Sequence, residues 1–278
     1  MDEARQAGVS PPERPARPQA WRKIRKAGIA AGAVVFAFIA YTQIRDYRLD
    51  RQLVLESPDR IPPDPALLSY ASSVGKSAFQ ANCVSCHGAD MKGSLAKGVP
   101  DLTDNIWLYD FGRVSDIERT VLYGIRSGLG KSHNVTDMPA IGLQKALNPD
   151  EIKDVIAYTL SLSKHRQDPA AVERGSKIFQ DKGVCYDCHS RDATGIPDYG
   201  APSLIDDDWL YGGDEKTIYK SVYDGRHGSC PAWIGKLSFP TIRAVAVFIH
   251  AMSKESPDSP NKRTASGAPA GEKDQSHG

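Results

Sequence analysis

The hydrophobic pattern of the chain is dominated by one long apolar run near the N-terminus. Residues 27–44 (AGIAAGAVVFAFIAYTQI) carry no charge and are just long enough to cross a bilayer as a helix. Several basic residues come before it, namely Arg14, Arg17, Arg22, Lys23, Arg25 and Lys26. The positive-inside rule therefore predicts a cytoplasmic leader at 1–26, a retained anchor at 27–44, and the rest of the chain on the far side of the membrane. A cleaved signal peptide is the alternative, but no small-x-small site follows the run.

Beyond the anchor, apolar residues recur at helical spacing, with proline and glycine between the periodic segments. Residues 45–69 begin charged and end in a proline-rich stretch, which predicts a tether. Residues 254–278 are rich in Ser, Pro, Lys and Gly and lack an apolar period, as is typical of a disordered tail. The net formal charge of +1 gives no indication of nucleic-acid binding.

An internal repeat occupies nearly all of the chain between tether and tail. Each copy has a glycine and a phenylalanine four apart, as on one face of a short helix, and ends in an apolar helical segment that carries Tyr158 or Phe248. The matching segments are 75–90 with 175–192, 98–109 with 200–211, 117–128 with 218–228, and 137–163 with 229–253. The repeat predicts two tandem domains, at 70–165 and 168–253.

Four of the five cysteines lie in two copies of the pattern C-x-x-C-H. Two thiols at this spacing can each form a thioether to a haem vinyl group, and the adjacent histidine can reach the iron from one face. A zinc knuckle or a redox pair is less favoured, because the histidine follows at once and the pattern occurs twice. The sequence therefore predicts two covalently bound c-type haems, attached at Cys83, Cys86, Cys185 and Cys188, with axial ligands His87 and His189.

Each copy resembles a class I cytochrome c in the order of its parts: a helix, the haem motif, a loop, short helices, a methionine loop and a final helix. The resemblance implies an all-α fold, in which an N-terminal transmembrane helix is followed by two tandem class I cytochrome c domains. In each domain the first and last helices are expected to pack together.

The same resemblance indicates the second axial ligands. Met138 lies where class I cytochromes place a methionine that raises the haem potential, and Cys230 occupies the same position in the second copy. We therefore expect His87 and Met138 on haem 1, and His189 and Cys230 on haem 2. A thiolate stabilises ferric iron, so haem 2 is expected to have the lower potential.

Other ligand sets compete with this one. Cys230 can be a thiol that only fills space, since free cysteine packs as a small apolar residue. Haem 2 can instead take His227, three residues upstream, or keep an open position. His133 is a lesser rival to Met138 and is expected to be a loop histidine.

Two further pairs of repeated residues are candidates for contacts with the haem propionates. Trp107 and Trp209 share one sequence frame, and an indole N–H there can donate a hydrogen bond to a propionate. Arg126 and Arg226 follow the same short helix and can neutralise propionates. The alternative roles are core aromatics and solvated surface arginines.

The segments GVPDLTDNIWLYDFG and GAPSLIDDDWLYGG, the segments VLYGIRSG and SVYDGRHG, and the M/C-P-A loops resemble subunit III of cbb3-type cytochrome c oxidases. The resemblance implies a non-catalytic, single-pass subunit of the bacterial inner membrane with its haem domains in the periplasm. Such a subunit takes electrons from a soluble or membrane cytochrome and relays them to a monohaem cytochrome subunit and a haem–copper core.

The sequence departs from that family at Cys230, where the family has methionine, and around the anchor, which lacks the usual proline-and-tryptophan entry and long linker. A thiolate-bound haem fits poorly on a downhill path towards oxygen. The alternatives are an off-path haem 2, a strongly reducing donor, or an electron-transfer role in another membrane oxidoreductase. A sulfur-oxidising cytochrome similar to thiosulfate dehydrogenases is the enzymatic alternative.

Overall fold

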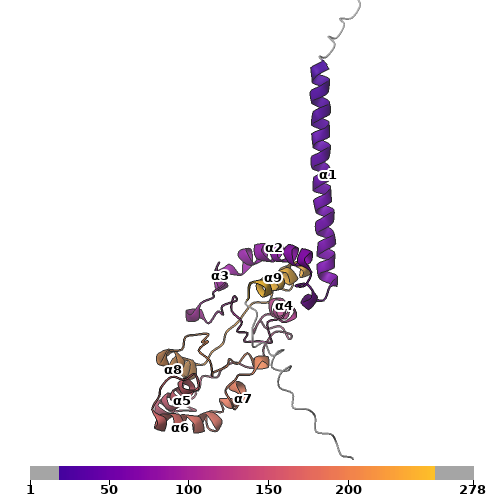
Figure 1. The fold of residues 1–278 in the computed structure, drawn as a ribbon. Coiled ribbons are helices and arrows are strands. Elements are labelled where there is room, and N and C mark those ends of the chain that lie inside the picture. Colours follow the sequence, from indigo (N-terminus) through magenta and orange to yellow (C-terminus); the bar gives the residue numbers. More distant parts are fainter. Residues whose placement is uncertain (1–18, 254–278) are drawn as a thin grey trace, which may run out of the picture. The chain divides into compact units, whose positions relative to one another are not determined.

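The computed structural model describes residues 19–253, and the all-α prediction is confirmed: within that range there are isolated β-bridges but no strands (Figure 1). Residues 1–18 of the predicted leader and the predicted tail, 254–278, lie outside the described residues. Contacts divide the described residues into two units, 19–49 and 50–253. The helices, with 3-10 helices written η, are α1 (Gln19–Leu55), η1 (Pro58–Arg60), α2 (Pro65–Asn82), α3 (Val84–His87), η2 (Leu95–Lys97), α4 (Val114–Tyr123), α5 (Pro149–Leu162), α6 (Pro169–Gln180), α7 (Tyr186–His189), η3 (Pro197–Tyr199), α8 (Glu215–Asp224) and α9 (Phe239–Met252).

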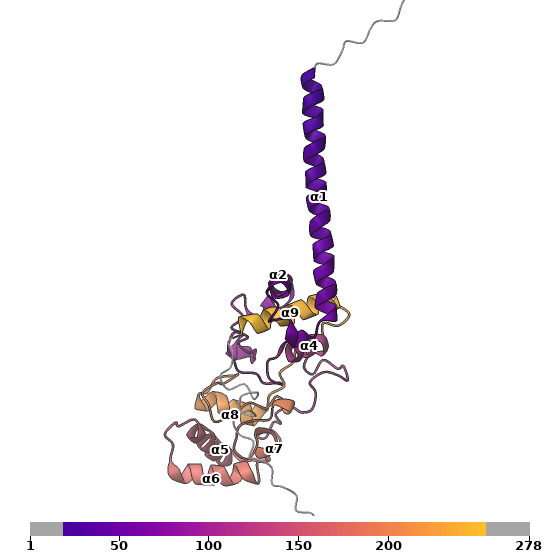
Figure 2. The same cartoon turned by 45° about the vertical axis from the view of Figure 1, so that its right-hand side comes forward.

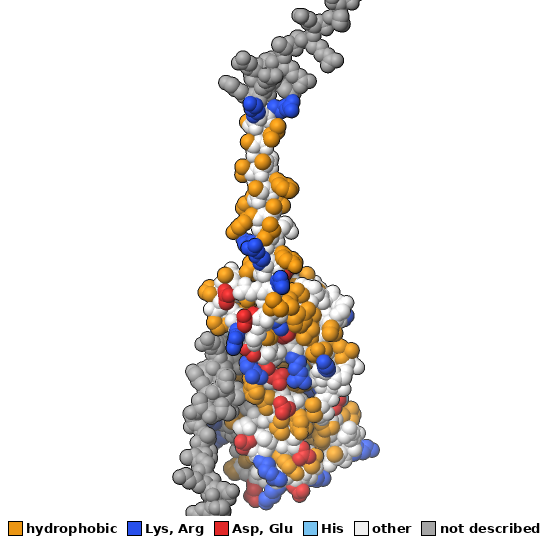
Figure 3. Space-filling view, turned by 90° about the vertical axis from the view of Figure 1, so that its right-hand side faces the viewer, with side chains coloured by type: hydrophobic (Ala, Val, Ile, Leu, Met, Phe, Trp, Pro, Cys, Tyr) orange, Lys and Arg blue, Asp and Glu red, His pale blue; other side chains and the backbone are white. Residues whose placement is uncertain are grey.

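Helix α1 contains the predicted anchor and continues beyond it. Among the described residues it is the one helix that is long and apolar enough to cross a bilayer. Figure 3 shows apolar side chains along α1, with basic side chains towards both ends of the apolar band. The first eleven residues of the predicted tether, 45–55, are helical because no proline or glycine interrupts them before Pro58.

The helices that lead into the two haem motifs begin in the same way. The carboxylate of Asp64 accepts hydrogen bonds from the first N–H groups of α2, and that of Asp168 does so for α6. Pro65 and Pro169 each follow as the first helical residue, where the missing N–H costs nothing. The internal repeat therefore includes these Asp-Pro helix starts.

The main helix contacts join helices from different copies of the repeat. Helix α2 packs on α9, and α5 packs on α6, so each copy's first helix meets the last helix of the other copy. Figures 1 and 2 show the two resulting groups within residues 50–253. We call the group of α2, α3, α4 and α9 the first lobe, and the group of α5, α6, α7 and α8 the second lobe. The predicted repeat is retained, but the tandem order within each lobe is not.

In the first lobe, Gly75 of α2 allows the backbone of α9 to approach closely. A Cβ atom at this position would lie 2.0 Å from the carbonyl oxygen of Ala244. One turn further along α2, the ring of Phe79 packs against that of Phe248, with 5.7 Å between centroids. The predicted glycine and phenylalanine thus form the helix crossing, with a partner from the other copy.

The second lobe repeats this crossing with different residues. A Cβ atom on Gly175 of α6 would lie 1.9 Å from the carbonyl oxygen of Asp154 on α5. The rings of Phe179 and Tyr158 meet edge to face at 5.2 Å. Both aromatic residues of the final helical segments, Phe248 and Tyr158, therefore pack on a first helix, but on the first helix of the other copy.

A short connection explains the exchange. Only residues 163–168 join α5 to α6, so the two helices form an antiparallel hairpin and bury their apolar faces against each other. The segment from Gly124 to Asn148, which joins α4 to α5, is long enough to carry the chain from the first lobe to the second. The chain returns through residues 225–238 before α9 begins.

A buried ion pair ties the end of α1 to the first lobe. Arg243 on α9 and Glu118 on α4 are 6% and 7% exposed, and Arg243 Nε donates to Glu118 Oε2 at 2.5 Å. Arg243 Nη1 also donates to the carbonyl oxygens of Leu53, Val54 and Glu56, at 2.9, 3.0 and 2.8 Å. The arginine thereby satisfies carbonyl groups that the end of α1 leaves without helical partners.

The helix exchange predicts how the chain behaves when it is cut between its halves. Residues 164–167 can be replaced by a protease recognition sequence. After cleavage we expect the two fragments to remain bound to each other, because each lobe contains helices from both fragments. Size-exclusion chromatography under native conditions and in denaturant would measure this. Two fragments that separate under native conditions would contradict the exchange.

The buried ion pair predicts a large loss of stability in Arg243→Met. That substitution leaves the Glu118 carboxylate buried without its partner, which typically costs about 3–5 kcal/mol in the free energy of unfolding. Denaturant titration of the detergent-solubilised chain would measure the loss. The double variant Arg243→Met, Glu118→Gln is expected to lose less than Arg243→Met alone, and an equal or larger loss would refute a charge-pairing role.

Candidate functional site

Both haem motifs line one continuous cavity of about 670 Å³. Its walls are mostly apolar and come from both lobes, including Phe179, Leu147 and Val155 as well as the two C-x-x-C-H segments. Such a cavity fits a large flat apolar group that is held by a few polar and metal-binding side chains. The residues present therefore fit two c-type haems, whose attachment sites face a shared space.

The short helices α3 and α7 place His87 and His189 at the cavity wall. In the second copy, His189 Nδ1 lies 2.9 Å from the carbonyl oxygen of Pro202, which directs the other ring nitrogen towards the cavity. Burial lowers the pKa of both histidines, while the carbonyls of Pro202 and Pro100 act in the opposite direction. A neutral imidazole at neutral pH is the form that binds iron.

The structure places Met138 in the second lobe, not beside the first haem motif. Its side chain packs on the core cluster of that lobe together with Cys185 and Trp209. The backbone N–H of Met138 donates to the carbonyl of Arg226 at 3.2 Å, and the N–H of Arg226 donates to the carbonyl of Met138 at 3.0 Å. Met138 therefore lies with the attachment site that ends in His189 and not beside the first motif, where the sequence placed it; its role as an iron ligand stays a prediction.

Cys230 shows the reciprocal placement and lies with the first haem motif. Its N–H donates to the carbonyl of Ile125 at 3.0 Å, and the N–H of Ile125 donates back at 2.9 Å. Burial raises the pKa of the Cys230 thiol, and the nearby Cys86 sulfur raises it further. The sequence placed Cys230 with the second motif, but its loop crosses to the first lobe, just as the Met138 loop crosses to the second; its role as an iron ligand stays a prediction.

Two glycines allow this exchange of loops. Gly124 and Gly225 end α4 and α8 with φ angles of 73° and 74°, which favour glycine. A Cβ atom on Gly124 would lie 2.4 Å from the carbonyl oxygen of Cys230, and one on Gly225 would lie 2.5 Å from that of Met138. The two crossings are thus equivalent, with methionine in one and cysteine in the other.

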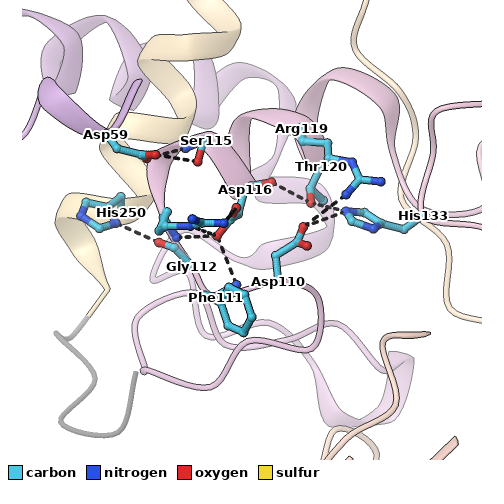
Figure 4. Close-up of polar contacts among 11 residues, drawn as sticks. Asp59, Asp110, Phe111, Gly112, Ser115, Asp116, Arg119, Thr120, His133 and His250 are labelled. Atoms are coloured by element: carbon cyan, nitrogen blue, oxygen red, sulfur yellow. Dashed lines mark hydrogen bonds and ion pairs between the residues drawn. The ribbon is translucent and has the colours of Figure 1, made fainter. Parts of the chain in front are cut away.

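Neither histidine rival lines the cavity. His133 is 5% exposed; its ring packs on Tyr109 with 4.4 Å between centroids, and Nε2 lies 3.1 Å from Thr120 Oγ1. Figure 4 shows His133 within a polar cluster on α4, with Asp110 and Arg119 beside it. His227 is exposed and pairs with Asp137 at 2.5 Å. Both positions count against these histidines as axial ligands.

The predicted propionate residues line the cavity, where their role stays a prediction. Trp107 and Trp209 pack against Gly112 and Gly213, so their indoles are held in equivalent positions. The two arginines make different contacts at the cavity wall.

Arg126 donates through Nε to the carbonyl of Gly228 at 2.6 Å and through Nη1 to that of Thr136 at 2.7 Å. It therefore fastens the two crossing loops together. Arg226 instead stacks on the ring of Tyr211, with 3.9 Å from Cζ to the centroid, and donates to Ser221 Oγ. Both side chains are fixed at the cavity wall.

Sequence reasoning missed two tyrosines that bridge the copies. A Cβ atom on Gly98 of the first copy would lie 2.2 Å from the ring of Tyr211, and one on Gly200 of the second would lie 2.1 Å from the ring of Tyr109. The W-L-Y frame gave the only signal, because the tyrosine repeats as faithfully as the tryptophan. Each tyrosine thus contacts the loop that follows the other copy's haem motif.

Comparison with known proteins gives two family matches and a consistent set of relatives. Residues 72–163 match the cytochrome c family, and residues 170–249 match the family of cbb3-type cytochrome c oxidase subunit III. The chain is 39% identical over 202 residues to the cbb3-type cytochrome c oxidase subunit CcoP of Cereibacter sphaeroides, covering 73% of this chain and 68% of that protein. It is 42% identical over 196 residues to subunit FixP of Bradyrhizobium sp. (strain ORS 278), covering 69% and 64%, respectively.

The two attachment motifs predict a haem content that can be counted. We expect two c-type haems per chain by pyridine haemochrome analysis, because each C-x-x-C-H segment reaches the cavity. The variants Cys83→Ala, Cys86→Ala and Cys185→Ala, Cys188→Ala should each retain one. A wild-type value of one, or a variant value of two, would contradict the assignment.

Proposed function

Because the chain belongs to the cbb3-type cytochrome c oxidase subunit III family, we propose that it is a membrane-anchored dihaem electron-transfer subunit of a cbb3-type oxidase. The observation that carries the proposal is the single cavity lined by both haem motifs. Electron transfer between two haems slows steeply as they move apart, so a shared cavity suits passage from one haem to the other.

The chain's own residues give the haems their attachment, orientation and surroundings. Bound c-type haem supplies one-electron chemistry through its ferric and ferrous states. The four motif cysteines would attach the macrocycles, His87 and His189 would bind the irons, and the apolar walls would exclude water. Met138 supplies a thioether beside the second attachment site, and a thioether ligand raises the haem potential.

The anchor supports a location at the bacterial inner membrane. Helix α1 exposes apolar side chains over its length, and Arg25 and Lys26 lie at the start of its apolar stretch. By the positive-inside rule, these charges remain in the cytoplasm and residues after the anchor lie in the periplasm. The haem lobes then face periplasmic electron donors.

The partners follow from this placement. A soluble or membrane-bound cytochrome is the proposed donor, and a monohaem cytochrome subunit leading to a haem–copper core is the proposed acceptor. Oxidation of a sulfur compound near Cys230 is the competing enzymatic function.

Oxygen uptake by the purified oxidase complex tests the proposal. We expect uptake driven by a reduced donor cytochrome to fall at least tenfold when the four attachment cysteines are all replaced by alanine, because the chain then carries no haem. The matched control is His227→Asn, which alters an exposed side chain away from the cavity and should leave uptake unchanged.

Co-purification with the haem–copper core separates the possible outcomes. Unchanged oxygen uptake in a complex that contains the haem-free chain would reduce this subunit to an assembly role and overturn the proposal. Catalytic reduction of the isolated wild-type chain by thiosulfate would favour the enzymatic function instead.

A further inference from the structure

The cavity contains an unequal pair of sulfur atoms. Its cysteine, histidine and methionine side chains are the four attachment cysteines, the two motif histidines, Met138 and Cys230. Once attachment and the first axial positions are assigned, Met138 and Cys230 remain for two irons. Among the described residues, these two are thus the sulfur donors available for the second axial positions.

Met138 and Cys230 occupy equivalent positions, one in each lobe. Met138 pairs with Arg226, the second residue after α8, and Cys230 pairs with Ile125, the second residue after α4, each through two backbone hydrogen bonds. A proline follows each of them, and Gly225 or Gly124 packs under its carbonyl group. Cys230 therefore occupies, in the first lobe, the place that Met138 occupies in the second.

The surroundings of Cys230 belong to the first attachment site. It lines the cavity together with Cys83 and Cys86, and its backbone pairs with Ile125, which follows α4 of the first lobe and Gly124. Trp233 and Thr120 also line the cavity, whereas the ring of His133 packs on Tyr109. No competing histidine reaches the cavity there within residues 19–253.

We propose that the Cys230 sulfur is the sixth ligand of the haem attached at Cys83 and Cys86, opposite His87, while Met138 binds the haem attached at Cys185 and Cys188. The proposal rests on haem attachment, which is part of the proposed function, but not on the oxidase as partner. It makes the haem of the first lobe the thiolate-ligated one, the reverse of what the order of the sequence suggests.

The chemistry of this bond is a simple ligand exchange. The thiol proton leaves to solvent, an Fe–S bond forms in place of any bound water, and no electron is transferred in that step. An anionic thiolate donates more strongly than a thioether and favours ferric iron. The haem of the first lobe then has the lower midpoint potential, and electrons that reach it pass readily to the haem beside Met138.

Electron paramagnetic resonance of the ferric full-length chain in detergent tests the ligand. We expect a low-spin signal with the narrow g-spread of thiolate ligation from one of two haems. Cys230→Met should abolish that signal, retain two haems, and raise one midpoint potential while leaving the other unchanged. Absence of the signal in the wild type, or its persistence in Cys230→Met, overturns the proposal.

A matched pair of histidine variants tests which haem is involved. His87→Ala removes the ligand opposite Cys230 and should alter or abolish the thiolate signal, whereas His189→Ala should leave that signal unchanged. The opposite result assigns Cys230 to the second haem and overturns the proposal. If His87→Ala does not accumulate, the variant Cys185→Ala, Cys188→Ala gives the same decision, because its single remaining haem must keep the thiolate signal. These spectra do not depend on oxygen uptake, so the two proposals fail separately.

Discussion

The close crossings of α2 with α9 and of α5 with α6 determine how both lobes of this molecule are built. Each crossing needs a glycine, Gly75 or Gly175, because a side chain there would collide with the backbone of the partner helix. Each also joins helices from different copies of the repeat. The short connection at 163–168 favours this pairing, since it holds α5 and α6 together as a hairpin.

The loops that supply sulfur to the cavity follow the helices. Because the chain enters the second lobe after α4 and leaves it after α8, Met138 lies beside Cys185 in the second lobe, and Cys230 pairs with Ile125 in the first. Arg126 fastens the two crossing segments through carbonyls at Thr136 and Gly228. Neither lobe is complete without the other, which explains why both attachment sites open into one cavity rather than two.

Much of this molecule could be predicted from local pattern. The apolar run, the C-x-x-C-H spacing and the repeated Gly and Phe positions depend on residues near one another in sequence, and the helices they predict are present. The exchange could not be found in this way, because a repeated sequence offers equivalent partners in both copies. Only the length of the 163–168 connection distinguishes them. For the same reason the sequence placed Met138 with the first motif and Cys230 with the second, whereas the structure places each in the other lobe.

Other contacts could not be predicted from the sequence because they join residues that are far apart along the chain. Arg243 appears as a single charge in an apolar helix, yet it binds Glu118 and the carbonyls at the end of α1 across more than a hundred residues. Tyr109 and Tyr211 appear as ordinary repeat residues, although each contacts a glycine of the other copy. The repeat marks such residues as related, but their partners depend on the folded chain.

The most direct test is an experimental structure of the haem-loaded chain at a resolution that distinguishes the axial ligands. We predict the Met138 sulfur on the iron of the haem attached at Cys185 and Cys188, with α5 packed on α6. Met138 bound to the haem attached at Cys83 and Cys86, with α2 packed on α5, would contradict it.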